Sequence, residues 1–291
     1  MRCAGLCIVI ATGCGRLAFD PRVDASGIDD AALGPFGTPV QVTELNVGMA
    51  GISDDDPTLT DDMLEIYFNS NRSGGGEILR STRTRVSDPW SAPQPVNELN
   101  SAATENTPQV SGDGLTIYLS SSRISSPDIF VSTRASRTDL WSVPALVAEL
   151  SGPDDDTGIH VSPDGLTAYL NLSTAGMIAT AELYRTTRTT TAMPWSTPTL
   201  ITELSSPLQD TDAFVTANDQ VIYWASDRSG NQEIWRATRP ATGAPFAQLE
   251  IVGELATPEE EEDVWISPDG RTLYLSRGPA IGTRSIYMTT R

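Results

Sequence analysis

Acidic residues recur at one position of a segment that the sequence repeats. Each stands six residues before the Ser or Thr that ends a short apolar run, and the five acids are Asp54, Glu105, Asp156, Asp210 and Glu261. Carboxylates are ligands that Ca²⁺ prefers, and a ring of them also attracts a basic partner. Such a ring would suit a Ca²⁺ site, with Asp54, Asp156, Asp210 and Glu261 as ligands, or a partner-binding mouth, and we expect no other cofactor.

Arginines offer these acids a structural role instead. An Arg follows the next apolar run in four copies, at Arg72, Arg123, Arg228 and Arg277, whereas the third copy has Ser173-Thr174-Ala175-Gly176 there. A feature present in every copy usually builds the repeat, so we favour ion pairing over a ligand site. If the acids need the arginine, Asp156 should differ from the others. More acids stand beside them, at Asp55, Asp56, Asp155, Asp212, Glu262 and Asp263.

Another position varies from copy to copy. Two residues before the closing Ser or Thr stand Thr58, Gln109, His160, Phe214 and Trp265. Aromatic and acidic groups around one mouth suit carbohydrate, because sugar rings stack on Phe and Trp. His160 is the only histidine, and without a second histidine or a cysteine nearby we assign no catalytic residue. The five repeated acids with His160, Phe214 and Trp265 are our candidates for ligand or partner binding.

The segments that must position these residues form a fivefold repeat. Thr-Arg recurs at Arg83, Arg134, Arg188, Arg239 and Arg291, and Glu-Leu recurs at Leu45, Leu99, Leu150, Leu204 and Leu255. The spacings are 51 to 54 residues, which is typical of propellers and solenoids. Each copy holds four strand-like segments. The second carries a tyrosine (Tyr67, Tyr118, Tyr169, Tyr223, Tyr274), and the fourth opens with an aromatic residue (Trp90, Trp141, Trp195, Phe246).

The count of segments distinguishes a ring from a solenoid. The chain stops at Arg291, directly after the third segment of its fifth copy, so the fourth segment is missing there. Residues 36–45 align without a gap with residues 195–204, which form a fourth segment. A ring closed by the two chain ends requires this arrangement, and closure hides sheet edges. We predict an all-β, five-bladed β-propeller of four-stranded antiparallel blades over residues 36–291, closed by the N-terminal strand.

The repeat resembles a known one. Asn97-Glu98-Leu99-Asn100-Ser101, Pro108 to Gly114, Ser120 to Arg123 and Asp128-Ile129-Phe130 look like the WD40-like PD40 repeat of TolB-type propellers. The resemblance covers residues 36–291 and implies the propeller fold in a bacterial envelope lipoprotein. TolB-type propellers usually have six blades and an added N-terminal domain, so their particular partners are not implied here.

The N-terminus is typical of an exported protein. Arg2 precedes an apolar run over residues 4–11, which is too short to span a bilayer as a mature helix. The run ends in Ala11-Thr12-Gly13-Cys14, which resembles the bacterial lipobox. We therefore predict a lipoprotein signal over residues 1–14, lipidation at Cys14 and a tether over residues 15–35. Gly15 follows the cysteine, where an Asp would resemble an inner-membrane retention signal, so we expect anchoring in the outer membrane, facing the periplasm or the exterior.

Composition excludes several classes of function. The net charge is −19, so a nucleic-acid partner would be repelled. All 19 basic residues are Arg, which excludes lysine chemistry. The cysteines are Cys3, Cys7 and Cys14, so the body of the chain has neither disulfides nor thiolate sites.

Three functions fit these observations. The first is an envelope-anchored, monomeric, non-catalytic propeller that binds a protein, peptidoglycan or glycan partner through one face. The alternative is a glycoside hydrolase, because one clan of these enzymes is five-bladed and carries its carboxylates on the innermost strands. The third is a structural propeller with Ca²⁺ in its acidic mouth. We favour the first, because acids repeated in every blade argue against the unequal roles that a glycoside hydrolase needs.

Overall fold

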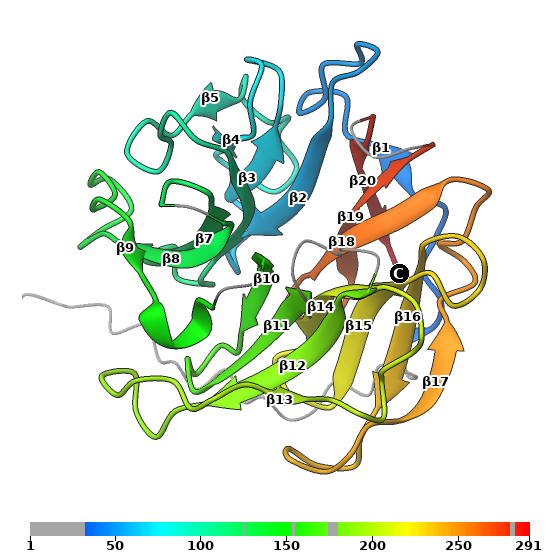
Figure 1. Ribbon diagram of the computed structural model, residues 1–291. Coiled ribbons are helices and arrows are strands. Elements are labelled where there is room, and N and C mark those ends of the chain that lie inside the picture. The colour runs from blue at the N-terminus through cyan, green and yellow to red at the C-terminus, as the bar shows by residue number, and fades with distance from the viewer. Residues whose placement is uncertain (1–32, 125, 153–154, 174–179, 280–282) are drawn as a thin grey trace, which may run out of the picture.

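The protein is a ring of five antiparallel sheets around a central axis (Figure 1). The computed structural model describes residues 33–291 except 125, 153–154, 174–179 and 280–282. The predicted signal over residues 1–14, with Cys14, and most of the tether lie outside these residues. Within the described part of the chain, no helix has the length and apolar character needed to cross a membrane. The prediction of a five-bladed all-β propeller is confirmed.

Each blade contains four strands. Blade 1 consists of β2 (Asp54–Leu59), β3 (Glu65–Ser70), β4 (Glu77–Thr82) and β5 (Gln94–Pro95). Blade 2 consists of β6 (Glu105–Val110), β7 (Thr116–Ser121), β8 (Asp128–Thr133) and β9 (Ala145–Leu146), followed by the 3₁₀ turn η2 (Ala148–Leu150). Blade 3 consists of β10 (Asp155–Val161), β11 (Thr167–Ser173), β12 (Glu182–Thr187) and β13 (Thr199–Leu200). Blade 4 consists of β14 (Asp210–Val215), β15 (Val221–Ser226), β16 (Glu233–Thr238) and β17 (Ala247–Ile251). Blade 5 consists of β18 (Glu260–Ile266), β19 (Thr272–Gly278), β20 (Ser285–Thr290) and β1 (Val40–Gln41).

The N-terminal strand closes the ring. Strand β1 pairs antiparallel with β20, with Val40 opposite Met288 and Gln41 opposite Tyr287. The amide of Gly37 adds a 2.9 Å hydrogen bond to the carbonyl of Thr290. The two chain ends therefore share one blade, as the count of segments predicts.

The recurring Thr-Arg arginines connect the strands within each blade. Each guanidinium lies over the aromatic residue that opens the fourth strand segment, at 4.1 to 4.4 Å from the ring centroid. The Nε of each also donates to a carbonyl of the first turn, on Met63, Gly114, Gly165, Asp219 and Gly270. A cation over an aromatic face contributes about 0.5 to 2 kcal/mol, so this contact stabilises the fold of each blade.

The hydrophobic core lies between neighbouring sheets. Its clusters join adjacent blades; one contains Tyr67 and Ile78 of blade 1 with Ile117 and Leu119 of blade 2. The repeated tyrosines and the leucines of Glu-Leu are buried in every blade. The first strands of neighbouring blades contact one another and line the axis. Any site on the axis is therefore built from the first strand of each blade.

Candidate functional site

The repeated acids lie inside the blades, where they are bound by protein groups. Asp54, Glu105, Asp156, Asp210 and Glu261 are at most 4% exposed. In blade 2, Glu105 accepts hydrogen bonds from Arg123 Nη2 at 3.1 Å, Ser121 Oγ at 2.9 Å and the amide of Ser101 at 2.9 Å. The same arginine donates to the carbonyl of Leu99 at 2.6 Å, so it connects the acid to the Glu-Leu segment.

Three other blades repeat this arrangement. Asp54 pairs with Arg72, Asp210 with Arg228 at 2.5 Å and Glu261 with Arg277 at 2.8 Å. In blade 3, which lacks the arginine, Asp156 instead accepts the amide of Gly152 at 2.6 Å. These contacts fit the structural role that the arginines indicated. The metal ligands predicted from sequence are therefore occupied by protein donors.

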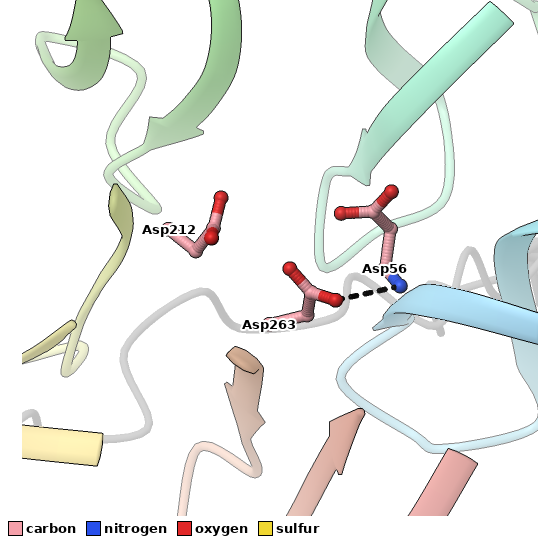
Figure 2. A group of neighbouring side chains, drawn as sticks. All are labelled: Asp56, Asp212 and Asp263. Atoms are coloured by element: carbon pink, nitrogen blue, oxygen red, sulfur yellow. Dashed lines mark hydrogen bonds between the residues drawn. The ribbon is translucent and has the colours of Figure 1, made fainter. Parts of the chain in front are cut away.

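Three different carboxylates converge on the axis. Asp56, Asp212 and Asp263 each offer an oxygen within 4.8 Å of the others (Figure 2). They come from blades 1, 4 and 5, and all three are half-buried. The corresponding residues of blades 2 and 3 are Thr107 and Gly158. The acids that meet thus stand two residues after the repeated ones and occur in only three blades.

A bulge in the first strand turns these side chains toward the axis. The pairing of β2 with β3 breaks between Asp55 and Thr58, and blades 4 and 5 break at the corresponding place. Asp56, Asp212 and Asp263 take positive φ angles of 54°, 54° and 56°. Asp tolerates this conformation better than most residues, although it still costs about 1 kcal/mol or more. The bulge therefore places strained backbone at the three convergent carboxylates, and Thr107, the equivalent residue of blade 2, shares it with a φ of 45°.

Hydrogen bonds fix the orientation of the three carboxylates. The amide of Asp56 donates to Asp263 Oδ2 at 3.2 Å, as Figure 2 shows, and the amide of Thr107 donates to Asp56 Oδ2 at 3.2 Å. Asn171 binds Asp212 twice: its Nδ2 donates to Oδ1, and its Oδ1 accepts the Asp212 amide, both at 3.0 Å. The side chains are thus held in place before any ligand binds.

Burial and mutual repulsion favour protons on this cluster. Burial, and then the charge of Asp263, raise the pKa of Asp212 from 3.8 to about 7. The same two causes, in that order, raise the pKa of Asp56 well above its ordinary value and that of neighbouring Asp55 to about 6. The positive charge of Arg284 offsets a part of this rise in the pKa of Asp212. At neutral pH the cluster therefore holds at least one exchangeable proton.

A cavity of about 70 Å³ extends along the axis from the three carboxylates. The varying position lines it, including His160, Phe214 and Trp265. His160 is 8% exposed, and its ring lies 4.5 Å from that of Phe214. Burial lowers the pKa of His160 to about 4, so its imidazole is neutral at pH 7. Within the described part of the chain, its Nε2 has no hydrogen-bond partner.

Gly158 shapes one side of this cavity. A Cβ at Gly158 would lie 2.2 Å from Nδ2 of Asn171, the residue that holds Asp212. Blade 3 therefore contributes backbone where blades 1, 4 and 5 contribute carboxylates. The acids that line the cavity come from blades 1, 4 and 5, and the described residues of blade 3 that line it include no acid.

Several solved structures that resemble this fold are glycoside hydrolases. No family model matches the chain, and no curated relative matches it. The α-L-arabinofuranosidase from Podospora anserina has a TM-score of 0.62 at 12% identity, covering 89% of this chain and 96% of its own. An endo-arabinase from Bacteroides thetaiotaomicron has a TM-score of 0.57 at 15% identity, covering 89% and 98%. A putative TolB from Agrobacterium tumefaciens has a TM-score of 0.50 at 16% identity, covering 85% and 80%.

These findings correct the expectation of a non-catalytic binding propeller. Most of the neighbouring structures are glycoside hydrolases, so they favour the enzyme alternative, although identities this low show the fold alone. The argument against an enzyme also fails on geometry, because the carboxylates on the axis are not repeated in every blade. The likeness to TolB structures supports the propeller part of the PD40 resemblance.

Proposed function

We propose that the protein is a glycoside hydrolase whose reaction is carried out by Asp56, Asp212 and Asp263. The observation that carries this proposal is the convergence of three unequal carboxylates, with the pKa of Asp212 raised to about 7. Glycosidic hydrolysis needs one carboxyl group that is protonated and one that is ionised. With a pKa of about 7, Asp212 carries a proton in part of the molecules at neutral pH, and Asp263 stands beside it as the second carboxyl group.

Asp212 is the proposed general acid. Its proton passes to the leaving oxygen as the bond between that oxygen and the anomeric carbon breaks. Asp263, which accepts the amide of Asp56, is the proposed nucleophile and forms a bond to the anomeric carbon. Water then hydrolyses this ester while Asp212 takes a proton back, which regenerates both carboxyl groups.

The spacing of the oxygens indicates the stereochemical outcome. They lie within 4.8 Å of one another, which is nearer the ~5 to 5.5 Å of retaining enzymes than the ~6.5 to 9.5 Å of inverting ones. We therefore expect the anomeric configuration to be retained. The cavity of about 70 Å³ holds only a few water molecules, so the sugar binds at its mouth, above the carboxylates.

The substrate class to test first comes from the neighbours. One is an α-L-arabinofuranosidase and another an endo-arabinase, so arabinofuranosides and arabinan are the first candidates. Screening nitrophenyl glycosides, with α-L-arabinofuranoside first, tests the proposal. Asp263→Asn should reduce turnover at least 100-fold, whereas Glu149→Gln, at an exposed acid of η2, should leave it unchanged. Folded wild-type protein that cleaves none of the glycosides would contradict the proposal.

A cation site is the second candidate. Three carboxylate oxygens within 4.8 Å of one another match the ligand chemistry of Ca²⁺. A structural propeller of this kind should gain thermal stability in CaCl₂ relative to EDTA and lose that gain on Asp263→Asn. An equal melting temperature in both solutions would exclude it and leave the enzyme proposal standing.

The site of action follows from the N-terminal sequence. We propose that the chain is exported, lipidated at Cys14 and anchored in the outer membrane as a monomer, where glycan substrates are accessible to it. Cys14→Ser should abolish incorporation of labelled palmitate and move the protein from the membrane to the soluble fraction. Unchanged labelling would contradict lipidation at this residue.

A further inference from the structure

A second groove lies away from the axis, between blades 3 and 4. It has a volume of about 180 Å³ and is lined by β12 and β13 on one side and by the loop before β17 on the other. Strands β13 and β17 lie at the outer rim of the ring in Figure 1. The side chains that matter are Arg185, Thr199, Leu200, Glu203, Arg239 and Phe246. It shares no lining residue with the cavity on the axis.

Arg185 has lost the partner that its counterparts keep. In blade 1, Arg80 pairs with Glu65 at 3.1 Å, and in blade 4, Arg236 pairs with Glu250 at 2.7 Å. Blade 3 has threonines at both of these acid positions, Thr167 and Thr199. No acid therefore stands where the other two blades neutralise their arginine.

The environment of Arg185 makes an unpaired charge costly. The side chain is half-buried, and its Nε is buried without a hydrogen-bond partner within the described part of the chain. Arg239, the other cation of the groove, is already neutralised by Asp219 and also donates to the hydroxyl of Tyr169 at 2.9 Å. Among the described residues that line the groove, only Arg185 has a positive charge left for a ligand. A partly buried cation without a counterion favours binding of an anion.

We propose that this groove binds a monocarboxylate through Arg185. A guanidinium offers a planar pair of N–H donors that matches a carboxylate. The groove supplies one free positive charge, and Glu203 adds a negative charge at its edge, which disfavours a dianion such as phosphate. Leu200 and Phe246 provide apolar contacts for the body of the ligand. A uronate sugar and the C-terminus of a peptide both present this chemistry.

Titration calorimetry or NMR with three probes tests the proposal. D-glucuronate and an N-acetyl amino acid represent the two sources, and D-glucose is the uncharged match for glucuronate. We expect wild-type protein to bind at least one carboxylate with a millimolar or lower Kd and to bind glucose at least tenfold more weakly. Whichever carboxylate binds more tightly identifies the source.

Variants assign the binding to this groove. Arg185→Gln should weaken carboxylate binding at least tenfold without lowering the melting temperature, because no ion pair is lost. Glu203→Gln should tighten it several-fold and keep the 3.1 Å bond that the Phe246 amide donates to Oε1. Arg236→Gln, at the paired arginine of blade 4, should leave it unchanged. No binding by wild-type protein, or equal binding by Arg185→Gln, would overturn the proposal; neither result bears on hydrolysis at the axis.

Discussion

Replacing Asp212 with asparagine should stabilise the protein at alkaline pH while it removes the proposed general acid. A carboxyl whose pKa is raised by folding binds its proton more tightly in the folded state. The stability it contributes is complete below the unfolded pKa near ~3.9 and is lost as the pH rises toward the folded pKa, here about 7. Above that pH, wild-type protein must keep a buried charge on Asp212 that asparagine does not carry.

The size of the effect follows from the pKa of Asp212. A rise from 3.8 to about 7 corresponds to about 4 kcal/mol, at ~1.4 kcal/mol for each pKa unit. Asp212 is half-buried, so water shares in its solvation, and we expect about 2 kcal/mol in favour of Asp212→Asn at pH 8. Asparagine keeps an oxygen that can accept from Asn171 Nδ2, so the local geometry is preserved.

Urea unfolding at two pH values, in EDTA, measures this difference. At pH 8 the variant should be the more stable protein, and at pH 4 the free energies of unfolding should agree within about 0.5 kcal/mol. A control variant, Asp54→Asn, should instead be destabilised at pH 8, because it breaks the buried pair with Arg72. If Asp212→Asn is less stable than wild-type at pH 8, or if the difference does not change with pH, folding does not raise the pKa of Asp212.

Three further predictions concern a buried ion pair, core packing and the space beside Gly158. Arg72→Ala should lower the free energy of unfolding by about 3 kcal/mol at pH 7, because it leaves buried Asp54 without its cation; denaturant titration showing less than about 1 kcal/mol would refute the structural role. Leu45→Ala, at a fully buried residue just after the closing strand, should cost about 2 to 5 kcal/mol, and an unchanged melting temperature would refute ring closure. Gly158→Ala should displace Asn171, whose Nδ2 lies 2.2 Å from the new Cβ, and shift the pH dependence of the site; an unchanged pH profile would show that Asn171 does not position Asp212.

The fold could be predicted because its repeats agree at every level. Turn residues, buried tyrosines and Thr-Arg arginines recur at spacings of 51 to 54 residues. The tyrosines and arginines have the same packing role in every blade. The displaced fourth strand could be found because residues 36–45 carry the same pattern as residues 195–204. Ring closure was therefore a matter of counting.

The candidate site was harder to predict because the same repetition drew attention to the acids that lie inside the blades. Asp54 and its counterparts recur because they hold the arginines of the next hairpin. The signal for the site was a position that differs between copies, with acids at Asp56, Asp212 and Asp263 against Thr107 and Gly158. No strand periodicity predicts that these side chains face the axis, because a bulge with positive φ turns them there. The lack of an acidic partner for Arg185 was equally hard to predict. The positions where other blades have that acid lie on two other strands, β11 and β13.

The most direct test of the central claim is the pH dependence of kcat/KM on the best nitrophenyl glycoside. The account predicts that activity falls as the pH rises through about 7, where Asp212 loses its proton. It also predicts that Asp212→Asn removes this descending limb together with most of the activity on substrates with poor leaving groups. A rate that stays constant from pH 5 to pH 9, or an Asp212→Asn variant with wild-type kcat/KM on a glycoside with a poor leaving group, would contradict it.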